Sequence, residues 1–346
     1  MVLGLKLTRE VFAFLAVVAL WADPSVVGAA NIFVSGPMKM DASTGCSISL
    51  SGQIETGDVA ALSQIVDPVI AEDDNYPDFR TGAQIVLCLQ STGGSFLEGL
   101  RLAEYVSEKA ITTKVIPGGT CLSACALAFM GGNLDTRSGV GWLSSRYLHP
   151  TSTLGFHAPR LDLPEDGFTR KDVDRAYASA LLAIGLVSQN AKKLRLSQTL
   201  LTDMVNHIGD DLEMIDTVDD IAVNDIKLYG YDVVPMDERA SSFACWNAFR
   251  WEFHVGSFEH ELDNFDWTAV EMYPSENGLL SFTPFDGVMY CSHKVLALGG
   301  GDKDQVVQSE RSDLSDVRVN VVSAPWIRMP GNTPLRQIPL GSMRDF

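Results

Sequence analysis

The chain has 346 residues, of which 46% are hydrophobic, so it can bury a substantial core in one large domain or two modest ones. Its formal net charge of -18 argues against a nucleic-acid partner, because Lys and Arg side chains are too few to neutralise a phosphate backbone. The same negative charge disfavours contact with anionic lipid headgroups.

The N-terminus has the order of a secretory signal peptide. Lys6 and Arg9 precede an apolar run over residues 11–21, and small residues follow up to Ala30. The run is roughly half the ~20 residues that a membrane-spanning helix needs, which disfavours an uncleaved anchor. We therefore expect cleavage after Ala29 or Ala30, loss of residues 1–29, and a periplasmic or secreted protein with no stable membrane span.

Export makes disulfide bonds between the six cysteines possible, because an oxidising compartment permits them. Spacing alone does not determine the pairing, and we favour Cys245 with Cys291 because both lie in the C-terminal region, away from the other four. Buried free thiols are the alternative. No C-x-x-C or H-E-x-x-H motif is present, so we expect no metal site and no cofactor.

The first two thirds of the chain alternate between strand and helix patterns. Residues 30–45 are small and polar and predict an N-terminal tail. The predicted elements that follow are a strand at 47–54, a helix from Asp58, a strand at 83–89, a helix carrying Leu97 to Val106, a strand at 113–116 and a helix at 123–130. This alternation predicts an α/β fold, with right-handed βαβ units around a largely parallel sheet.

The longest predicted helix covers residues 169–195. Its apolar side chains recur at helical spacing and predict one buried face, made of Val173, Tyr177, Ala180, Leu181 and Ile184.

Beyond Pro235 the composition becomes rich in aromatic and β-branched residues. Alternation predicts strands at 249–255 and 317–321, and Asp286-Gly287 predicts a hairpin between the apolar runs on either side of it. We therefore expect a small β-rich module over residues 237–346.

Ser123 is the first candidate for chemistry. It stands where the glycine-rich turn at Gly118-Gly119 enters an apolar helix, so its hydroxyl can face the turn while unpaired N–H groups of the helix stabilise an oxyanion. A serine that only caps the helix is the simpler alternative.

Two further features complete a candidate site. Gly93-Gly94 follows a buried strand and lets backbone N–H groups approach a ligand, and with the N–H of Ala124 it could form an oxyanion hole. His157 can act as a general base near neutral pH. Each feature also has a structural explanation, as a tight turn or a hydrogen-bonded histidine, and His149 is a weaker candidate for the base.

Four motifs in chain order resemble a known family. They are I-x-L-x-G-x-I at 48–54, S-x-G-G at 91–94, a strand with a glycine-rich turn and Ser-Ala at 113–124, and His-x-Pro at 157–159. Together they resemble the proteolytic subunit of Clp protease. They are closer still to the exported Clp-like proteins of the crotonase superfamily, in which the serine often stands in C-x-S-A-C.

The resemblance implies a crotonase-like spiral of ββα units over residues 46–236. It implies Ser123 as nucleophile, His157 as base, and N–H groups of Ala124 and either Gly93 or Gly94 as the oxyanion hole. The third member is implied to be Asp216, which precedes Tyr229-Gly230; Asp219, Asp211 and Asp203 remain alternatives. The interval from Ser123 to His157 exceeds the family pattern, and we expect residues 142–151 to form an extra loop.

These expectations describe an exported serine hydrolase, with peptidase as the favoured activity and a polypeptide as substrate. No P-loop is present, so the activity is expected not to depend on ATP bound by this chain. The main rival is a catalytically silent protein that binds peptides or envelope partners in the same cleft. Acyl-CoA chemistry is disfavoured by export, and a homo-oligomer is left open.

Overall fold

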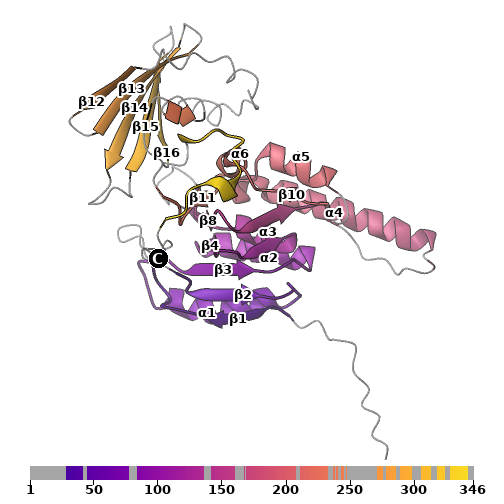
Figure 1. Cartoon of the computed structure of the whole chain (residues 1–346). Coiled ribbons are helices and arrows are strands. Elements are labelled where there is room, and N and C mark those ends of the chain that lie inside the picture. The colour runs from indigo at the N-terminus through magenta and orange to yellow at the C-terminus, as the bar shows by residue number, and fades with distance from the viewer. Residues whose placement is uncertain are drawn as a thin grey trace, which may run out of the picture.

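The structure is a computed structural model. It describes residues 29–41, 45–77, 84–135, 142–159, 167, 169–207, 211–232, 237, 239, 240, 243, 244, 247 and 328–341, together with the backbone of five strands between 271 and 323. The expectation of an α/β protein is confirmed, because helices and both parallel and antiparallel strands occur together (Figure 1). The predicted signal peptide and the strand predicted at 249–255 lie outside the described residues.

A six-stranded sheet forms the centre of the molecule, in the order β1-β2-β3-β4-β8-β11. The strands are β1 (Asn31–Val34), β2 (Ile48–Ser51), β3 (Val86–Gln90), β4 (Thr112–Val115), β8 (Arg146–Leu148) and β11 (Lys227–Leu228). All neighbours from β2 onward are parallel, and only β1 runs antiparallel to its partner. The predicted largely parallel sheet is therefore confirmed.

A smaller sheet follows the carboxyl ends of these strands. It consists of β5 (Thr120–Leu122), β9 (Thr153–Phe156) and β10 (Glu213–Met214), with β5 and β9 parallel. Isolated bridges extend the same pattern toward β3 and β2, joining Ser91 to Cys121 and Ile54 to Gly94. After each of β2, β3, β4 and β8 the chain thus passes through a further extended segment before it turns.

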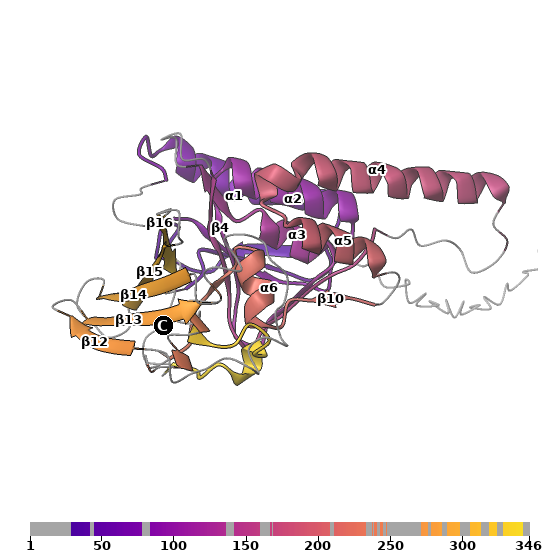
Figure 2. The same ribbon diagram turned by 90° about the horizontal axis from the view of Figure 1, so that it is seen from above.

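Six helices are described, of which the first three follow these short segments and the first four lie on one face of the sheet (Figure 2). They are α1 (Asp58–Ala71), α2 (Phe96–Glu108), α3 (Ala124–Met130), α4 (Arg170–Leu194), α5 (Gln198–Asn206) and α6 (Val218–Val223). Every residue of α3 is buried, so this helix is the centre of the core. Buried Glu98 in α2 accepts the N–H groups of Gly57 and Val59, each at 3.0 Å, and so caps the first turn of α1.

Two expectations are corrected by the packing. Residues 30–45 are not a tail, because β1 pairs with β2 along its whole length. The buried face predicted for α4 is wrong in its first half: Val173, Tyr177 and Leu181 are exposed, and Ala183, Val187 and Leu194 are the buried residues. Helical spacing located an apolar stripe correctly, but the first half of α4 extends past the other helices (Figure 2).

Residues 142–151 do not form an extra loop. They contain β7 (Trp142–Ser144), which pairs with β6 (Asn133–Asp135), and then β8 in the central sheet. The sequence WLSSRYL lacks a long apolar run because each strand has only three residues.

Arg146 in β8 holds the ends of several helices. Its side chain is completely buried, and its guanidinium donates five hydrogen bonds to backbone carbonyls. The carbonyls belong to Met130 at the end of α3, Leu194 and Arg195 at the end of α4, and Asn224 and Asp225 after α6. Burial lowers the pKa of Arg146 to about 9, which leaves the cation charged at neutral pH beside the negative ends of three helix dipoles.

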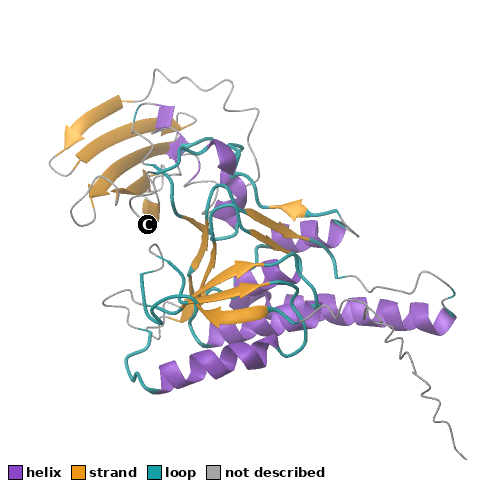
Figure 3. Ribbon diagram, turned by 60° about the horizontal axis from the view of Figure 1, so that its bottom comes forward, coloured by secondary structure: helices purple, strands orange, loops and turns teal. Residues whose placement is uncertain are grey.

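The C-terminal region divides into two parts. Strands β12 (Glu271–Ser275), β13 (Gly278–Phe285), β14 (Met289–Ala297), β15 (Gln305–Ser312) and β16 (Arg318–Ser323) form an antiparallel sheet in sequence order (Figure 3). The predicted hairpin is confirmed, because β13 and β14 pair on either side of Asp286-Gly287. The strand predicted at 317–321 corresponds to β16.

The last described segment belongs to the main body and corrects the predicted module at 237–346. Leu335, in the short helix η4 (Leu335–Gln337), and Ile338 are each 2% exposed and pack in the main hydrophobic core. The N–H of Leu335 donates to the carbonyl of Asp216 at 2.7 Å, and Tyr231 pairs with Leu340. Composition could not reveal that the chain comes back to the main body here, because the segment is short and has no strand pattern.

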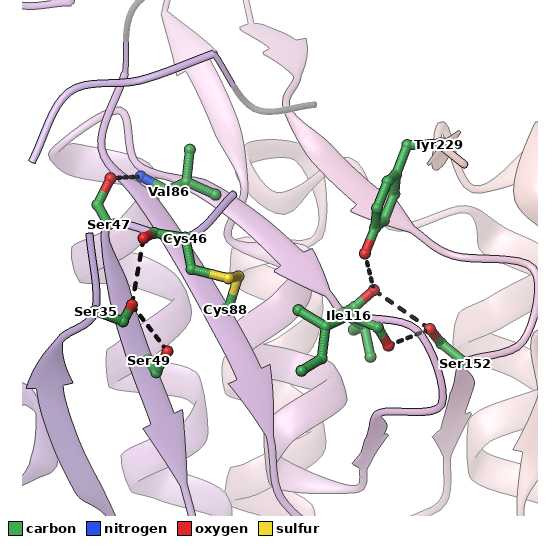
Figure 4. The surroundings of a disulfide bond; sticks show 10 residues. Ser35, Cys46, Ser47, Ser49, Val86, Cys88, Ile116, Ser152 and Tyr229 are labelled. Carbon is green, nitrogen blue, oxygen red and sulfur yellow. Dashed lines mark hydrogen bonds between the residues drawn. A yellow bond between two sulfur atoms is a disulfide. The ribbon is translucent and has the colours of Figure 1, made fainter. Parts of the chain in front are cut away.

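Two disulfides lie in the described residues. Cys46 bonds to Cys88 of β3, next to the bond that Ser47 Oγ accepts from the N–H of Val86 (Figure 4). This pair is 42 residues apart, and closing such a loop in the unfolded chain contributes about 4 kcal/mol in the chain-entropy model. Cys121 bonds to Cys125, four residues further on. Neither pair was singled out from spacing, and the favoured Cys245–Cys291 pair involves a residue outside the described part.

No helix among the described residues is long and apolar enough to cross a membrane.

We predict that Arg146→Met lowers the free energy of unfolding by at least about 3 kcal/mol, because five buried carbonyls lose their donor at once. Urea unfolding followed by circular dichroism measures the change. Arg175→Met is the control, because its side chain is 69% exposed and it makes only a 3.9 Å ion pair. Equal unfolding midpoints for the two variants would contradict the role given to Arg146.

Candidate active site

A cleft of about 650 Å³ opens beside the carboxyl end of β3 and the start of α3. Its lining includes Gly93, Gly94, Ser123, Phe156, His157 and Ala183. The structure therefore brings together Ser123, His157 and the diglycine, which are separate in the sequence. Helices α2, α4 and α5 also line the cleft, mostly with apolar side chains such as Leu97, Leu182 and Met204.

Ser123 lies at the junction of β5 and α3. Leu122 pairs with Gly155, and the N–H of Ser123 donates to the carbonyl of Gly155 at 2.9 Å. Continuing this parallel register places Ser123 beside Phe156, the residue before His157. The ladder between β5 and β9 thus explains why the two candidate residues share one cleft.

The backbone of Ser123 has an uncommon conformation. Its φ is 57° and its ψ is -121°, close to the first central residue of a type II′ turn, a position that normally takes glycine. A side chain held there costs about 1–3 kcal/mol, and such outliers are concentrated at functional sites. The hydroxyl makes no capping bond to α3, so the simpler explanation of Ser123 as a helix cap is not what the structure has.

The diglycine is packed against Ser123 with no room for a side chain. A Cβ on Gly93 would lie 2.7 Å from Ser123 Cβ, and one on Gly94 would lie 2.2 Å from the carbonyl oxygen of Ile54. Both residues also have positive φ, 108° and 140°. Glycine is required here for two reasons, the backbone conformation and the close approach.

The structure distinguishes between the two glycines as donors. The N–H of Gly93 donates to Ser91 Oγ at 3.0 Å, and the carbonyl of Gly93 accepts from the N–H of Ile54 at 2.8 Å. Within the described part of the chain, the N–H groups of Gly94 and Ala124 make no hydrogen bond. Gly94 is therefore the better candidate, with Ala124, for an oxyanion hole.

His157 is half-buried and lines the cleft. Its Nδ1 lies 2.7 Å from the carbonyl oxygen of Ala158. A carbonyl only accepts, so Nδ1 carries the proton and the neutral ring keeps Nε2 as its basic atom. The N–H of Ala158 donates in turn to the carbonyl of His207 at 2.8 Å. The backbone at Ala158 therefore orients the imidazole, as a carboxylate does in a Ser-His-Asp triad.

The structure does not bring the predicted acid to His157. Asp216 is exposed before α6, and its carbonyl, not its carboxylate, has the contact with Leu335. Asp211 lies 3.0 Å from His207 Nδ1, Asp203 is in α5, and Asp219 approaches Gly331. Within the described residues none of these carboxylates bonds to His157. His149 bonds to Thr151 and stacks edge-on against Tyr229, and it does not line the cleft.

Two contributors were missed from the sequence. Ser91 supports the diglycine turn with its side chain, and the Ala158 carbonyl holds the imidazole. Ser91 is the first residue of the S-x-G-G motif and could have been suspected from it, whereas a backbone carbonyl has no signature in the residue types. Among the described residues, no cluster of three or more His, Cys, Asp or Glu side chains could hold a metal ion.

No family model matches the chain, and no curated protein matches it.

We predict that Gly93→Ala abolishes the reaction of Ser123 with a fluorophosphonate, because the added Cβ must displace the serine. Mass spectrometry of the labelled peptide measures the reaction. Gly118→Ala is the control: it has positive φ as well, 68°, but a Cβ there meets nothing within 4 Å. Labelling of Gly93→Ala at the rate of Gly118→Ala would show that the diglycine does not position the serine.

Proposed function

We propose that this chain is an exported serine hydrolase that cleaves peptide bonds without ATP. The observation that carries the proposal is the strained Ser123, which lines the same cleft as His157, stands at the start of α3 and packs closely against Gly93. The cost of this conformation is understandable if the serine must present its hydroxyl to a substrate.

The chemistry follows from these groups. His157 Nε2 takes the proton of the Ser123 hydroxyl as the oxygen attacks the acyl carbon, and returns it to the leaving amine. The N–H groups of Gly94 and Ala124 stabilise the oxyanion. A water molecule then hydrolyses the acyl-enzyme by the same steps in reverse. The site acts as a Ser-His dyad, with the Ala158 carbonyl holding the Nδ1 proton.

The family assignment is part of the proposal. Repetition of long strand, short extended segment and helix from β2 to α3 supports a crotonase-like spiral of ββα units. The C-x-S-A-C motif supports the exported Clp-like branch. Two disulfides are compatible with an oxidising compartment, which supports export.

A polypeptide substrate is supported by the Clp resemblance and by a cleft with many apolar side chains and room for several residues. Among the described residues no carboxylate forms a hydrogen bond with His157, which favours a second candidate, a silent protein that binds peptides in this cleft. The two candidates differ in whether Ser123 forms a covalent bond.

We predict that Ser123→Ala and His157→Ala each remove most fluorophosphonate labelling and peptidase activity. Because the two residues act as a unit, the double variant should be hardly slower than either single one. Ser123→Ala should leave the melting temperature close to that of the wild type, since the hydroxyl does not cap α3. A folded wild type that stays unlabelled after long exposure would exclude the hydrolase and leave the silent binding protein.

The surroundings of His157 give a separate prediction, because no carboxylate among the described residues forms a hydrogen bond with its ring. Asp216→Asn should change turnover by less than about threefold, because the Ala158 carbonyl already fixes the tautomer that Asp fixes in a triad. Asp219→Asn, in the first turn of α6, serves as the comparison. A loss of about 10²-fold or more in Asp216→Asn alone would restore Asp216 as the third member and contradict the dyad.

A further inference from the structure

Ser123 lies at the middle of the shortest disulfide loop in the described chain. Cys121 and Cys125 are bonded at a Cα–Cα distance of 5.1 Å, two residues to either side of the serine. Both cysteines are fully buried. The disulfide therefore spans Ser123, whose uncommon backbone conformation the proposed chemistry needs.

The disulfide connects two elements that are each fixed independently. Cys121 is in the middle of β5, held by bonds of its neighbours Thr120 and Leu122 to Ser91. Cys125 is the second residue of α3, whose every residue is buried. Ser123 forms the junction between the strand and the helix, and the disulfide spans this junction.

Other contacts at Ser123 do not by themselves require its positive φ. Its N–H donates to Gly155 and its carbonyl accepts from Leu127 at 3.1 Å, as in any helix start beside a strand. A non-glycine residue keeps a strained conformation only where the surroundings leave it no alternative. A covalent bond across the junction removes the extended alternative, because the two Cα atoms must stay close together.

We propose that the Cys121–Cys125 disulfide is a positioning element for the nucleophile, which holds Ser123 in its reactive backbone conformation and aims the N–H of Ala124 at the oxyanion. The inference rests on the proposed hydrolase function. It assigns the pair an effect on the reaction of bound substrate, while the walls of the cleft, and hence binding, stay the same.

The Cys46–Cys88 disulfide, which joins β3 of the central sheet to the residue pair before β2, provides a matched control. It closes a loop of sequence separation 42, against 4 for Cys121–Cys125, so it restricts the unfolded chain far more. Neither of its cysteines lines the cleft. Loss of Cys46–Cys88 should therefore mainly lower the melting temperature, and loss of Cys121–Cys125 should mainly lower reactivity.

The experiment compares wild type, Cys121→Ala/Cys125→Ala and Cys46→Ala/Cys88→Ala in fluorophosphonate labelling over a range of probe concentrations. For the first pair we expect the maximal labelling rate to fall about 10²-fold, while the probe concentration at half-maximal rate stays within about threefold. For the second pair we expect both values within about twofold of wild type and a larger drop in melting temperature.

Reduction gives a second route that changes no side chain volume. Dithiothreitol supplies two electrons and two protons, breaks the sulfur–sulfur bond into two thiols, and closes to its own cyclic disulfide. Labelling of the Cys46→Ala/Cys88→Ala variant should slow on reduction and recover on reoxidation with oxidised glutathione. Labelling of Cys121→Ala/Cys125→Ala should not slow further, which excludes an effect of other cysteines.

The outcomes separate the two proposals. A labelled wild type whose rate is the same without Cys121–Cys125 overturns the positioning role and leaves the hydrolase intact. A rate that falls only in proportion to the folded fraction does the same. If Cys121→Ala/Cys125→Ala does not fold, the reduction of folded Cys46→Ala/Cys88→Ala decides. An unlabelled wild type overturns the hydrolase itself.

Discussion

The buried guanidinium of Arg146 is the contact on which the arrangement of the helices depends. A helix leaves its last four carbonyls without partners, and in the core no water is available to satisfy them. Arg146 satisfies carbonyls at the ends of α3, α4 and α6 with one side chain. Its planar group offers five donors in a fixed geometry, which lysine could not match. The end of α3, the helix that begins beside Ser123, is therefore held by the same side chain as the ends of α4 and α6.

Backbone strain is concentrated at the start of α3 and is absent at its end. The end of the helix is satisfied and buried, while its beginning holds a serine in a conformation that suits glycine. Gly93, in the neighbouring turn, packs closely against that serine, and Ser91 Oγ stabilises the turn by accepting the N–H of Gly93. The rigid body of the fold thus supports a small strained region, as is common where chemistry is performed.

Local patterns in the sequence predicted the strands and helices from Ile48 to Met130 except β5, because apolar runs and glycine turns are short-range signals and β5 has only three residues. They were also sufficient for Ser123, His157 and the diglycine as candidates. They failed where tertiary context decides. The apolar stripe of α4 has the period of a helix, yet its burial depends on how far the helix extends past its neighbours. The group that holds the His157 ring is the backbone carbonyl of Ala158, which any amino acid could provide.

The return of the chain at Leu335 has a consequence for the order of assembly. The N–H of Asp232 bonds to the carbonyl of Pro339 at 2.8 Å, so the chain leaves the body and re-enters it at almost the same point. The antiparallel sheet β12–β16 is in this sense an insertion within the body, and not a successor to it. Because synthesis runs from the N-terminus, the core around α6 must wait for Leu335 and Ile338 while the inserted strands can already pair among themselves. Vectorial synthesis therefore gives this protein an inner module that can be complete before the outer one is closed.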